Sequence, residues 1–273
     1  MGRPYAEVIG DPIAHSKSPL IHNFWLAKLG IDAEYRTCHV RPDELEDYVT
    51  KRRGDADWRG CNVTIPHKVA VLKFASEMSS AVRTVGAANC LFPARAGLQA
   101  DNTDCGGVAA AIPDALTTAC IIGAGGAARA AIPSLNHFCV EHIRVIARDV
   151  EAAAKMLIAQ EFPADVYAFS DAAAALCGSE GVINASPLGM AGQPPMPQSV
   201  LDALALTSDD AFVFDMVYSP IETELLRTAR SIDRATIDGL VMLVGQAADA
   251  FRCFFGISPP RQHDAELRAL LTR

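Results

Sequence analysis

The stretch at residues 119–135 constrains the fold of this chain more than any other. A short apolar run at 119–122 ends abruptly in a turn with glycine at 123, 125 and 126, and an alanine-rich helical pattern continues to about Leu135. A strand, a glycine turn and a helix in the form G-x-G-x-x-A are typical of a dinucleotide-binding unit. The sequence therefore predicts a Rossmann-type domain around this stretch.

Each small residue of the stretch has its own physical role. Gly123 can make the tight turn, Gly125 leaves room for a pyrophosphate against the backbone, and Ala128 lets the helix pack on its strand. The free N–H groups at the helix N-terminus attract an anion. Glycine patterns of this kind also mark ordinary tight turns, but the flanking strand and helix and a second predicted strand at 143–146 favour a cofactor site.

Composition excludes several classes of partner. The chain has 273 residues, half of them apolar, which is enough for a large core and two modest domains. Its net charge is −8 and it has no basic run, so we expect neither nucleic acid nor an anionic membrane as a partner. No segment approaches the ~18 uncharged apolar residues of a membrane span, and the first residues lack the apolar region of a signal peptide. We therefore expect a cytoplasmic protein.

The cysteine and histidine residues show no metal-binding pattern. Eight cysteines lie far apart without a C-x-x-C pair, which is typical of small buried thiols in a reducing compartment. The seven histidines form no H-x-x-x-H cluster. We expect no bound metal.

Predicted strands and helices alternate along the whole chain, which indicates the α/β class with a parallel, doubly wound sheet. In the first third, we expect strands at 5–10, 34–39 and 60–63, helices at 18–29, 42–52 and 66–74, and a hairpin at 87–100. Further on, we expect strands at 120–123, 143–147, 166–168, 181–184, 212–215 and 236–238, and helices at 104–111, 150–160, 240–255 and 263–271. We predict two domains, residues 1–103 joined by the C-terminal helices 240–273, and a Rossmann-type domain at 104–239.

Polar residues gather at the carboxyl ends of the first predicted strands. The clusters lie at 15–19, 62–68, 86–90 and 101–104. In parallel α/β sheets, strand ends and the loops after them carry function. Ser16, Ser18 or Thr64 could each be an ordinary helix N-cap. Four clusters of hydroxyl, amide, lysine and aspartate side chains nevertheless predict a pocket for a small polyhydroxylated acid.

Motifs along essentially the whole chain resemble those of the shikimate dehydrogenase family, in order and spacing. They are S-K-S-P, N-V-T-I-P-H-K, G-A-A-N-C, D-N-T-D, G-A-G-G-A-A-R, N-A-S-P-L-G-M, D-M-V-Y and D-G-L-V-M-L-V-G-Q. The resemblance implies an N-terminal α/β domain that binds substrate and a Rossmann-type domain that binds NADP(H). It also implies reversible reduction of 3-dehydroshikimate to shikimate, a step of aromatic amino acid biosynthesis.

The resemblance assigns the reacting groups to Lys68 and Asp104. Lys68 would be the proton-transfer residue at the carbonyl or hydroxyl that is interconverted, and Asp104 would bind the neighbouring ring hydroxyl and the lysine. The chemistry agrees, because hydride delivery to a ketone leaves an alkoxide that a nearby ammonium stabilises and protonates. The alternatives are a solvated helix lysine for Lys68 and an N-cap of the following helix for Asp104.

The resemblance also assigns residues that bind the substrate and the cofactor. Ser16, Ser18 and Tyr218 would hold the substrate carboxylate, and Thr64, Asn89 and Gln246 would bond ring hydroxyls. Gly123, Ala124, Gly125, Gly126 and Ala127 would take the pyrophosphate, Met216 and Gly239 would line the nicotinamide, and Arg148 and Asp149 would face the adenosine end. The alternatives are a packing aromatic for Tyr218 and a surface helix position for Gln246.

The chain departs from the usual family pattern at four places. His67 stands where phenylalanine is usual, Cys90 replaces a common threonine, and Cys105 follows Asp104 in place of glycine. The first three departures adjoin the predicted pocket and leave the exact substrate open. For His67 we favour packing over a second acid–base role, because adjacent helical residues point about 100° apart.

The fourth departure concerns the choice of cofactor: residues 147–149 are Ala-Arg-Asp, where the family usually has Asn-Arg-Thr. Arg148 could stack on adenine or pair with a 2′-phosphate. Asp149 could accept a bond from a 2′-hydroxyl and would repel a phosphate. We expect NADP, with NAD as the alternative. A quinate or shikimate dehydrogenase that uses NAD, and a non-catalytic nucleotide-binding sensor, remain the other hypotheses, and the protein is expected to be a monomer or a homodimer.

Overall fold

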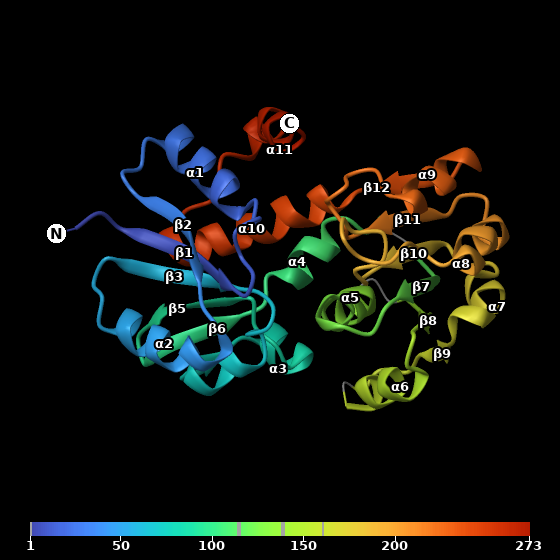
Figure 1. Cartoon of the computed structure of the whole chain (residues 1–273), viewed down its shortest axis with the longest axis horizontal. Coiled ribbons are helices and arrows are strands. Elements are labelled where there is room, and N and C mark those ends of the chain that lie inside the picture. Colours follow the sequence, from blue (N-terminus) through green and yellow to red (C-terminus); the bar gives the residue numbers. More distant parts are fainter. Residues whose placement is uncertain (1, 114–115, 138–139, 160) are drawn as a thin grey trace. The chain divides into compact units, whose positions relative to one another are not determined.

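Two compact units make up the chain. The computed structural model describes residues 2–113, 116–137, 140–159 and 161–273 (Figure 1). The first unit comprises Met1–Thr103 and Val244–Arg273, and the second comprises Asp104–Leu243. The chain therefore passes between the units at 103/104 and again at 243/244, where the sequence predicts 103/104 and 239/240.

The first unit is built on a mixed six-stranded sheet of order β2-β1-β3-β5-β6-β4. Its strands are β1 (Tyr5–Gly10), β2 (Glu34–His39), β3 (Trp58–Val63), β4 (Glu77–Met78), β5 (Cys90–Ala94) and β6 (Gly97–Asp101). Strand β1 runs parallel to β2 and β3, whereas β5 is antiparallel to β3 and β6. The carboxyl ends of β1, β2 and β3 therefore meet at one edge of the sheet.

Helices cover both faces of this sheet. They are α1 (Ser18–Leu29), α2 (Leu45–Arg53), α3 (Ser80–Val85) and residues 244–255 of α10 (Gly239–Phe255), with 3-10 turns η1 (Pro42–Glu44) and η2 (Ala70–Phe74). Helix α11 (Asp264–Leu271) contacts α1 and the 3-10 turn η5 (Arg261–His263). Helix α1 has proline in its first turn and ends at Gly30 with a left-handed φ of 64°, which explains why its bounds are predictable from the sequence. Side chains of β1 alternate between two clusters, Ile9 with α2 and Val8 with α10.

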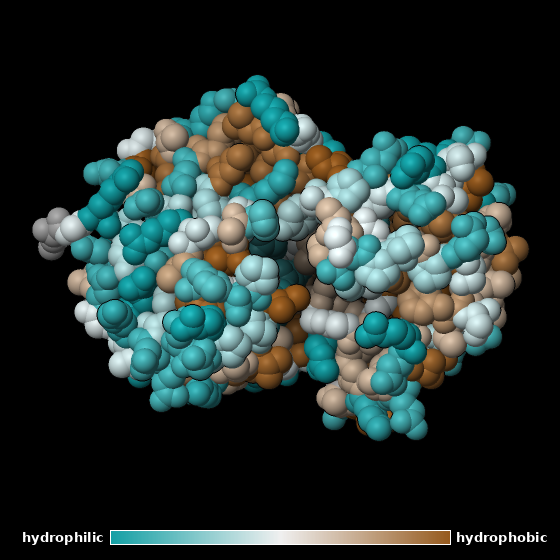
Figure 2. Space-filling model, in the orientation of Figure 1, coloured by the Kyte–Doolittle hydropathy of each residue, from teal (hydrophilic) through white to brown (hydrophobic). Residues whose placement is uncertain are grey.

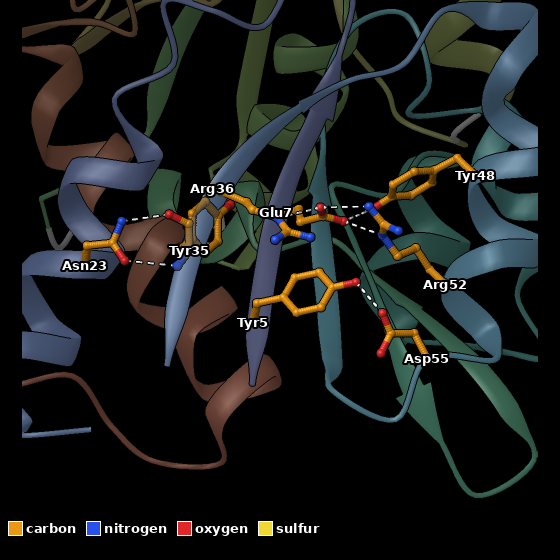
Figure 3. A network of polar contacts seen from close by, with 8 residues as sticks. All are labelled: Tyr5, Glu7, Asn23, Tyr35, Arg36, Tyr48, Arg52 and Asp55. Carbon is orange, nitrogen blue, oxygen red and sulfur yellow. Dashed lines mark hydrogen bonds and ion pairs between the residues drawn. The ribbon is translucent and has the colours of Figure 1, made fainter. Parts of the chain in front are cut away.

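A buried carboxylate interrupts the apolar pattern of β1. Glu7 is 1% exposed, and it accepts hydrogen bonds from Arg36 (3.0 Å), Tyr48 (2.8 Å) and Arg52 (2.8 and 3.0 Å). Figure 3 shows Glu7 between Arg36 on β2 and the Tyr48 and Arg52 side chains of α2. The carboxylate raises the pKa of the Arg52 guanidinium. Because its partners satisfy both oxygens, the charge is tolerated inside the sheet.

The second unit is a parallel six-stranded sheet of order β12-β11-β10-β7-β8-β9. Its strands are β7 (Thr118–Ile122), β8 (His142–Ile146), β9 (Asp165–Tyr167), β10 (Gly181–Asn184), β11 (Phe212–Asp215) and β12 (Ala235–Ile237). Numbered from β7, this is the order 3-2-1-4-5-6 of the Rossmann fold, with the switch point between β7 and β10. The predicted α/β class and doubly wound domain are confirmed.

Helices pack on both faces of the second sheet. They are α4 (Asp104–Ala109), α5 (Gly126–His137), α6 (Val150–Ala159), α7 (Ala172–Leu176), α8 (Gln198–Ala203) and α9 (Glu224–Ser231), with η3 (Phe169–Asp171) and η4 (Leu204–Leu206). Ile121 faces a core with α4, α5 and α6, and its neighbour Ile122 faces a core with α7, α8 and α9. Because both faces of this sheet are buried, its strands consist of continuous runs of apolar residues.

The structure corrects the sequence prediction at several elements. The helix expected at 66–74 is a pair of turns followed by η2, so Lys68 lies in a turn and not on a helix. In a helix the Lys68 carbonyl would accept a bond from Leu72; instead it accepts one from Ala88 N–H at 2.8 Å, and Leu72 N–H bonds the Val69 carbonyl. The helices α3, α7, α8 and α9 were not predicted.

Figure 2 shows a visible face that is mostly hydrophilic or intermediate in hydropathy, with separate hydrophobic areas. The cysteines that the structure describes are free thiols; Cys61, Cys90 and Cys120 are buried as expected, but Cys177 is exposed, and Cys139 lies outside the described residues. Within the described residues, no helix is long and apolar enough to cross a membrane.

Candidate active site

The glycine turn after β7 has the geometry of a phosphate-binding site. Gly123 has a φ of +112°, and a Cβ there would lie 3.0 Å from the Ser186 Cβ and 3.1 Å from the Ala185 carbonyl oxygen. Only glycine fits this position. A Cβ added at Gly125 or Gly126 would meet nothing within 4 Å. The open side of the turn at the N-terminus of α5 therefore fits the pyrophosphate of a dinucleotide.

A buried polar network supports the loops around this turn. Asn184 donates to Asp215 Oδ1 at 2.9 Å and accepts from the Ser186 hydroxyl at 2.6 Å, and Thr223 Oγ1 donates to Asp215 Oδ2 at 2.6 Å. Burial raises the pKa of Asp215, and hydrogen bonds from Thr223, Val217 N–H and Asn184 oppose that rise. The network links the carboxyl ends of β10 and β11. Sequence reasoning missed it, although Asn184 and Asp215 open two of the motifs quoted above.

The predicted nicotinamide residues lie together in the second unit. Met216 follows β11, and Gly239 opens α10. A Cβ at Gly239 would lie 2.5 Å from the Met216 carbonyl oxygen and 2.6 Å from that of Val217, so the helix start packs directly on the loop that carries Met216. Tyr218 comes next on the same loop, and burial raises the pKa of its phenol. The partial burial of the Tyr218 ring is compatible both with a packing role and with binding of the substrate carboxylate.

Arg148 and Asp149 follow β8, the strand beside β7. Both side chains are exposed. Asp149 Oδ1 accepts a 2.9 Å hydrogen bond from Ala152 N–H and caps α6. The Ile146 carbonyl, just before this pair, accepts a bond from Gly123 N–H at 2.8 Å. The pair therefore lies on the segment that is tied to the glycine turn.

Neither Ser16 nor Ser18 occupies the N-cap position of α1. The N-cap position is Lys17, and its side chain makes no capping hydrogen bond. Ser16 Oγ accepts a 3.3 Å bond from Ser18 N–H, and Ser18 is the buried first residue of the helix. Thr64 precedes η2 by several residues, and the N-cap of η2 is Val69. The capping interpretation is therefore wrong for Ser18 and Thr64, whereas the Ser16 hydroxyl does accept a bond from an N–H of the first turn.

Asn89 is held in one orientation by Thr103. Its Oδ1 accepts from Thr103 N–H at 2.8 Å, and its Nδ2 donates to Thr103 Oγ1 at 3.0 Å. The Asn89 carbonyl accepts from Val63 N–H at 2.7 Å and from Asn62 Nδ2 at 3.2 Å, and Tyr35 donates to Asn62 Oδ1 at 2.6 Å. Sequence reasoning did not single out this supporting chain, since no local pattern connects Tyr35 with Asn62.

Lys68, Asp104 and Gln246 are the remaining predicted site residues, and all three are at least half-buried. Lys68 is half-buried, and its backbone is bonded to Ala88, the residue before Asn89. Asp104 is the buried first residue of α4. Gln246 is buried in α10, so the surface alternative for it is wrong. Lys68, Thr64 and Asn89 thus lie around the carboxyl end of β3 in the first unit.

His67 is buried, as the packing interpretation predicted. Its side chain is 1% exposed. Its Nε2 lies 2.7 Å from the Val40 carbonyl oxygen, a contact between segments that are 27 residues apart. The argument from helical geometry does not apply, because residues 66–69 form turns.

The fold and this site define a class: a two-domain α/β enzyme with a Rossmann-type dinucleotide-binding unit. A family profile described as "Shikimate dehydrogenase substrate binding domain" matches residues 8–91, and one described as "Shikimate 5'-dehydrogenase C-terminal domain" matches residues 239–266. A protein of Sphingopyxis alaskensis named shikimate dehydrogenase (NADP(+)) is 46% identical over 98% of this chain and 97% of its own. The chain belongs to the shikimate dehydrogenase family, and the resemblance is confirmed.

Two solved structures show the range of this fold. Shikimate 5-dehydrogenase of Thermus thermophilus, in complex with NADP(H) and shikimate, is 27% identical with a TM-score of 0.84, over 98% of this chain and 99% of its own. Quinate dehydrogenase of Corynebacterium glutamicum, in complex with NAD, is also 27% identical, with a TM-score of 0.87 and the same coverage. The fold is therefore compatible with both substrates and both cofactors.

Proposed function

We propose that this oxidoreductase catalyses the reversible NADP(H)-dependent reduction of 3-dehydroshikimate to shikimate. The observation that carries the proposal is the 46% identity, over nearly the whole chain, with a relative named shikimate dehydrogenase (NADP(+)). Membership of an enzyme family also argues against a non-catalytic sensor.

Lys68 is the proposed proton-transfer residue. The cofactor, when bound, supplies or accepts the hydride. Lys68 donates a proton to the oxygen that becomes the hydroxyl, and takes it back in the reverse direction. An ammonium at that oxygen also stabilises the charge that develops there. The turn geometry of residues 66–69 supports this role, because it anchors the lysine backbone to Ala88.

Asp104 is the proposed partner in orienting the substrate. Its carboxylate accepts a hydrogen bond from the ring hydroxyl next to the reacting carbon. Its buried position at the start of α4 supports a fixed orientation.

The other proposed contacts divide by chemistry. The hydroxyls of Ser16, Ser18 and Tyr218 donate to the substrate carboxylate. Thr64, Asn89 and Gln246 bond the ring hydroxyls; the Thr103 contacts that orient Asn89 support its assignment.

The cofactor contacts follow from the second unit. Gly123, Ala124, Gly125, Gly126 and Ala127 take the pyrophosphate, Met216 and Gly239 line the nicotinamide, and Arg148 and Asp149 face the adenosine end. Residues 1–103 with 240–273 serve as the substrate domain and residues 104–239 as the cofactor domain. We place the protein in the cytoplasm as a monomer or homodimer; the free thiols support a reducing compartment.

A second candidate is a quinate or shikimate dehydrogenase that uses NAD. The carboxylate of Asp149, next to Arg148, favours it, because a negative charge there repels a 2′-phosphate. The chain keeps both serine hydroxyls of the S-K-S-P motif, Ser16 and Ser18, and for this reason we propose shikimate and not quinate as the substrate.

The test is an absorbance assay at 340 nm that crosses shikimate and quinate with NADP and NAD. We expect the highest kcat/KM with shikimate and NADP. Lys68→Ala should lower kcat about 10²–10⁴-fold with little change in KM, the usual effect of losing an acid–base group. The matched control is Lys73→Ala, since Lys73 forms an exposed ion pair with Glu46 and should keep full activity. No turnover of shikimate with either cofactor would overturn the proposal.

A further inference from the structure

We propose that His67 is a positioning residue for Lys68, and that its Nε2–H bond to the Val40 carbonyl fixes the turn on which the lysine lies. The inference rests on the proposed function of Lys68. It adds a residue that has no part in the reaction itself, and it explains why a ring with a hydrogen-bond donor lies at this buried position.

The bond links the ends of three strands. His67 belongs to the turns after β3, and Val40 is the residue after β2. The 2.7 Å contact joins these two segments, and Val40 N–H in turn donates to the carbonyl of Gly10, the last residue of β1, at 3.3 Å. The Lys68 turn is thereby held to the rigid edge of the sheet.

The direction of the bond follows from its partners. A backbone carbonyl only accepts, so His67 Nε2 carries a proton and donates it. One of the two neutral tautomers of histidine carries its proton on Nε2, so a neutral ring makes this bond.

Three neighbours of His67 in this segment have exposed side chains. Ile65 is 72% exposed and Val69 is 64% exposed, and Pro66 is also exposed. Among residues 64–70, all of which the structure describes, His67 alone is buried. Backbone bonds hold the flanks, with Asp11 N–H to the Ile65 carbonyl at 3.0 Å and Ala88 N–H to the Lys68 carbonyl at 2.8 Å. The backbone of His67 bonds only nearby residues, Thr64 and Val71, so its side chain adds a bond from the middle of the turn to a distant segment.

The consequence for catalysis is geometric. A proton-transfer group must lie within hydrogen-bond reach of the reacting oxygen. Without the His67 donor, the Val40 carbonyl loses a partner and the turn can shift. Displacements of about 1 Å at a catalytic group can cost up to about 10²-fold in rate.

The fold contains a matched control for the loss of a buried histidine. His22 lies in α1 of the same unit, it is fully buried, and neither ring nitrogen has a hydrogen-bond partner. Its ring stacks on Tyr35 with a centroid distance of 4.0 Å. His22→Phe therefore removes a buried imidazole without removing a hydrogen bond.

The experiment compares three variants of His67 with His22→Phe in the full-length enzyme. His67→Phe keeps an aromatic ring but removes the donor. His67→Gln places an amide N–H near the position of Nε2, whereas His67→Asn places it near that of Nδ1. For each variant we would measure kcat, KM for shikimate at saturating NADP, and the Tm.

We expect kcat to fall about tenfold in His67→Phe and His67→Asn, with KM changing less than about threefold, because the turn is misplaced and the binding groups remain. His67→Gln should recover most of kcat, and His22→Phe should keep it. An unchanged kcat in a folded His67→Phe, or equal kcat in the Gln and Asn variants, would overturn the inference. Failure of the proposed function is distinguishable, since wild type would then lack activity or Lys68→Ala would retain it.

Discussion

Asp149 Oδ1 accepts a 2.9 Å hydrogen bond from Ala152 N–H, so the carboxylate that bears on cofactor choice is also the N-cap of α6. The two roles can be separated, because serine caps a helix about as well as aspartate but has no charge. Asp149→Ser should raise the NADP/NAD ratio of kcat/KM about tenfold, equivalent to about 1.4 kcal/mol of removed repulsion. Steady-state kinetics with both cofactors would measure it.

The control for this prediction is Asp149→Ala. It should shift the same ratio and also lower stability by about 1 kcal/mol, because the cap is lost. A ratio that is the same in wild type and Asp149→Ser would refute the charge argument.

Thr223 serves the Rossmann unit twice, as donor to Asp215 Oδ2 at 2.6 Å and as N-cap of α9 through Leu226 N–H at 3.3 Å. Thr223→Val removes both bonds and leaves a buried carboxylate oxygen without its hydroxyl. We expect a loss of about 1–3 kcal/mol in the free energy of unfolding, measured by urea titration. Thr223→Ser keeps the hydroxyl and should lie close to wild type. The interpretation fails if serine and valine destabilise equally.

The pH dependence of stability should contain a contribution from His22. Burial without a hydrogen-bond partner lowers the pKa of His22 from 6.5 to about 3. The unfolded chain therefore binds one more proton than the folded protein between those values. Above pH 6.5 the imidazole is neutral in both the folded and the unfolded protein, so it does not change the free energy of unfolding. As the pH drops from 6.5 towards 3, the free energy of unfolding falls.

His22→Phe isolates this contribution. Below about pH 6 the free energy of unfolding of wild type should decrease more steeply than that of the variant, by about 1.4 kcal/mol per pH unit. Urea titrations at pH 7, 5 and 4 would measure the difference, in which the carboxylates common to both proteins cancel. Parallel curves would mean that His22 does not titrate on unfolding.

Local patterns explain what could be predicted from the sequence, and distant contacts explain what could not. The strand, turn and helix around Gly123 follow from residues within one short stretch, so the Rossmann unit is predictable. The turn at Lys68 is not, because the bond that replaces the helix comes from Ala88, in another part of the chain. The partnership of Asn184 with Asp215 spans 31 residues, and no periodicity encodes it.

The Glu7 network also depends on contacts that the local sequence does not predict. Its partners are 29 to 45 residues away, and the residues around Glu7 have the pattern of an apolar strand. Glu7→Gln keeps the shape but removes the charge that Arg36 and Arg52 share. The guanidinium groups that remain are partly exposed, at 41% and 19%, so we expect a loss of about 1–3 kcal/mol in the free energy of unfolding from the weakened hydrogen bonds. Glu46→Gln, which breaks an exposed pair with Lys73, should cost about 0–1 kcal/mol. Equal losses in the two variants, measured by urea titration at pH 7, would show that burial adds nothing to the Glu7 network.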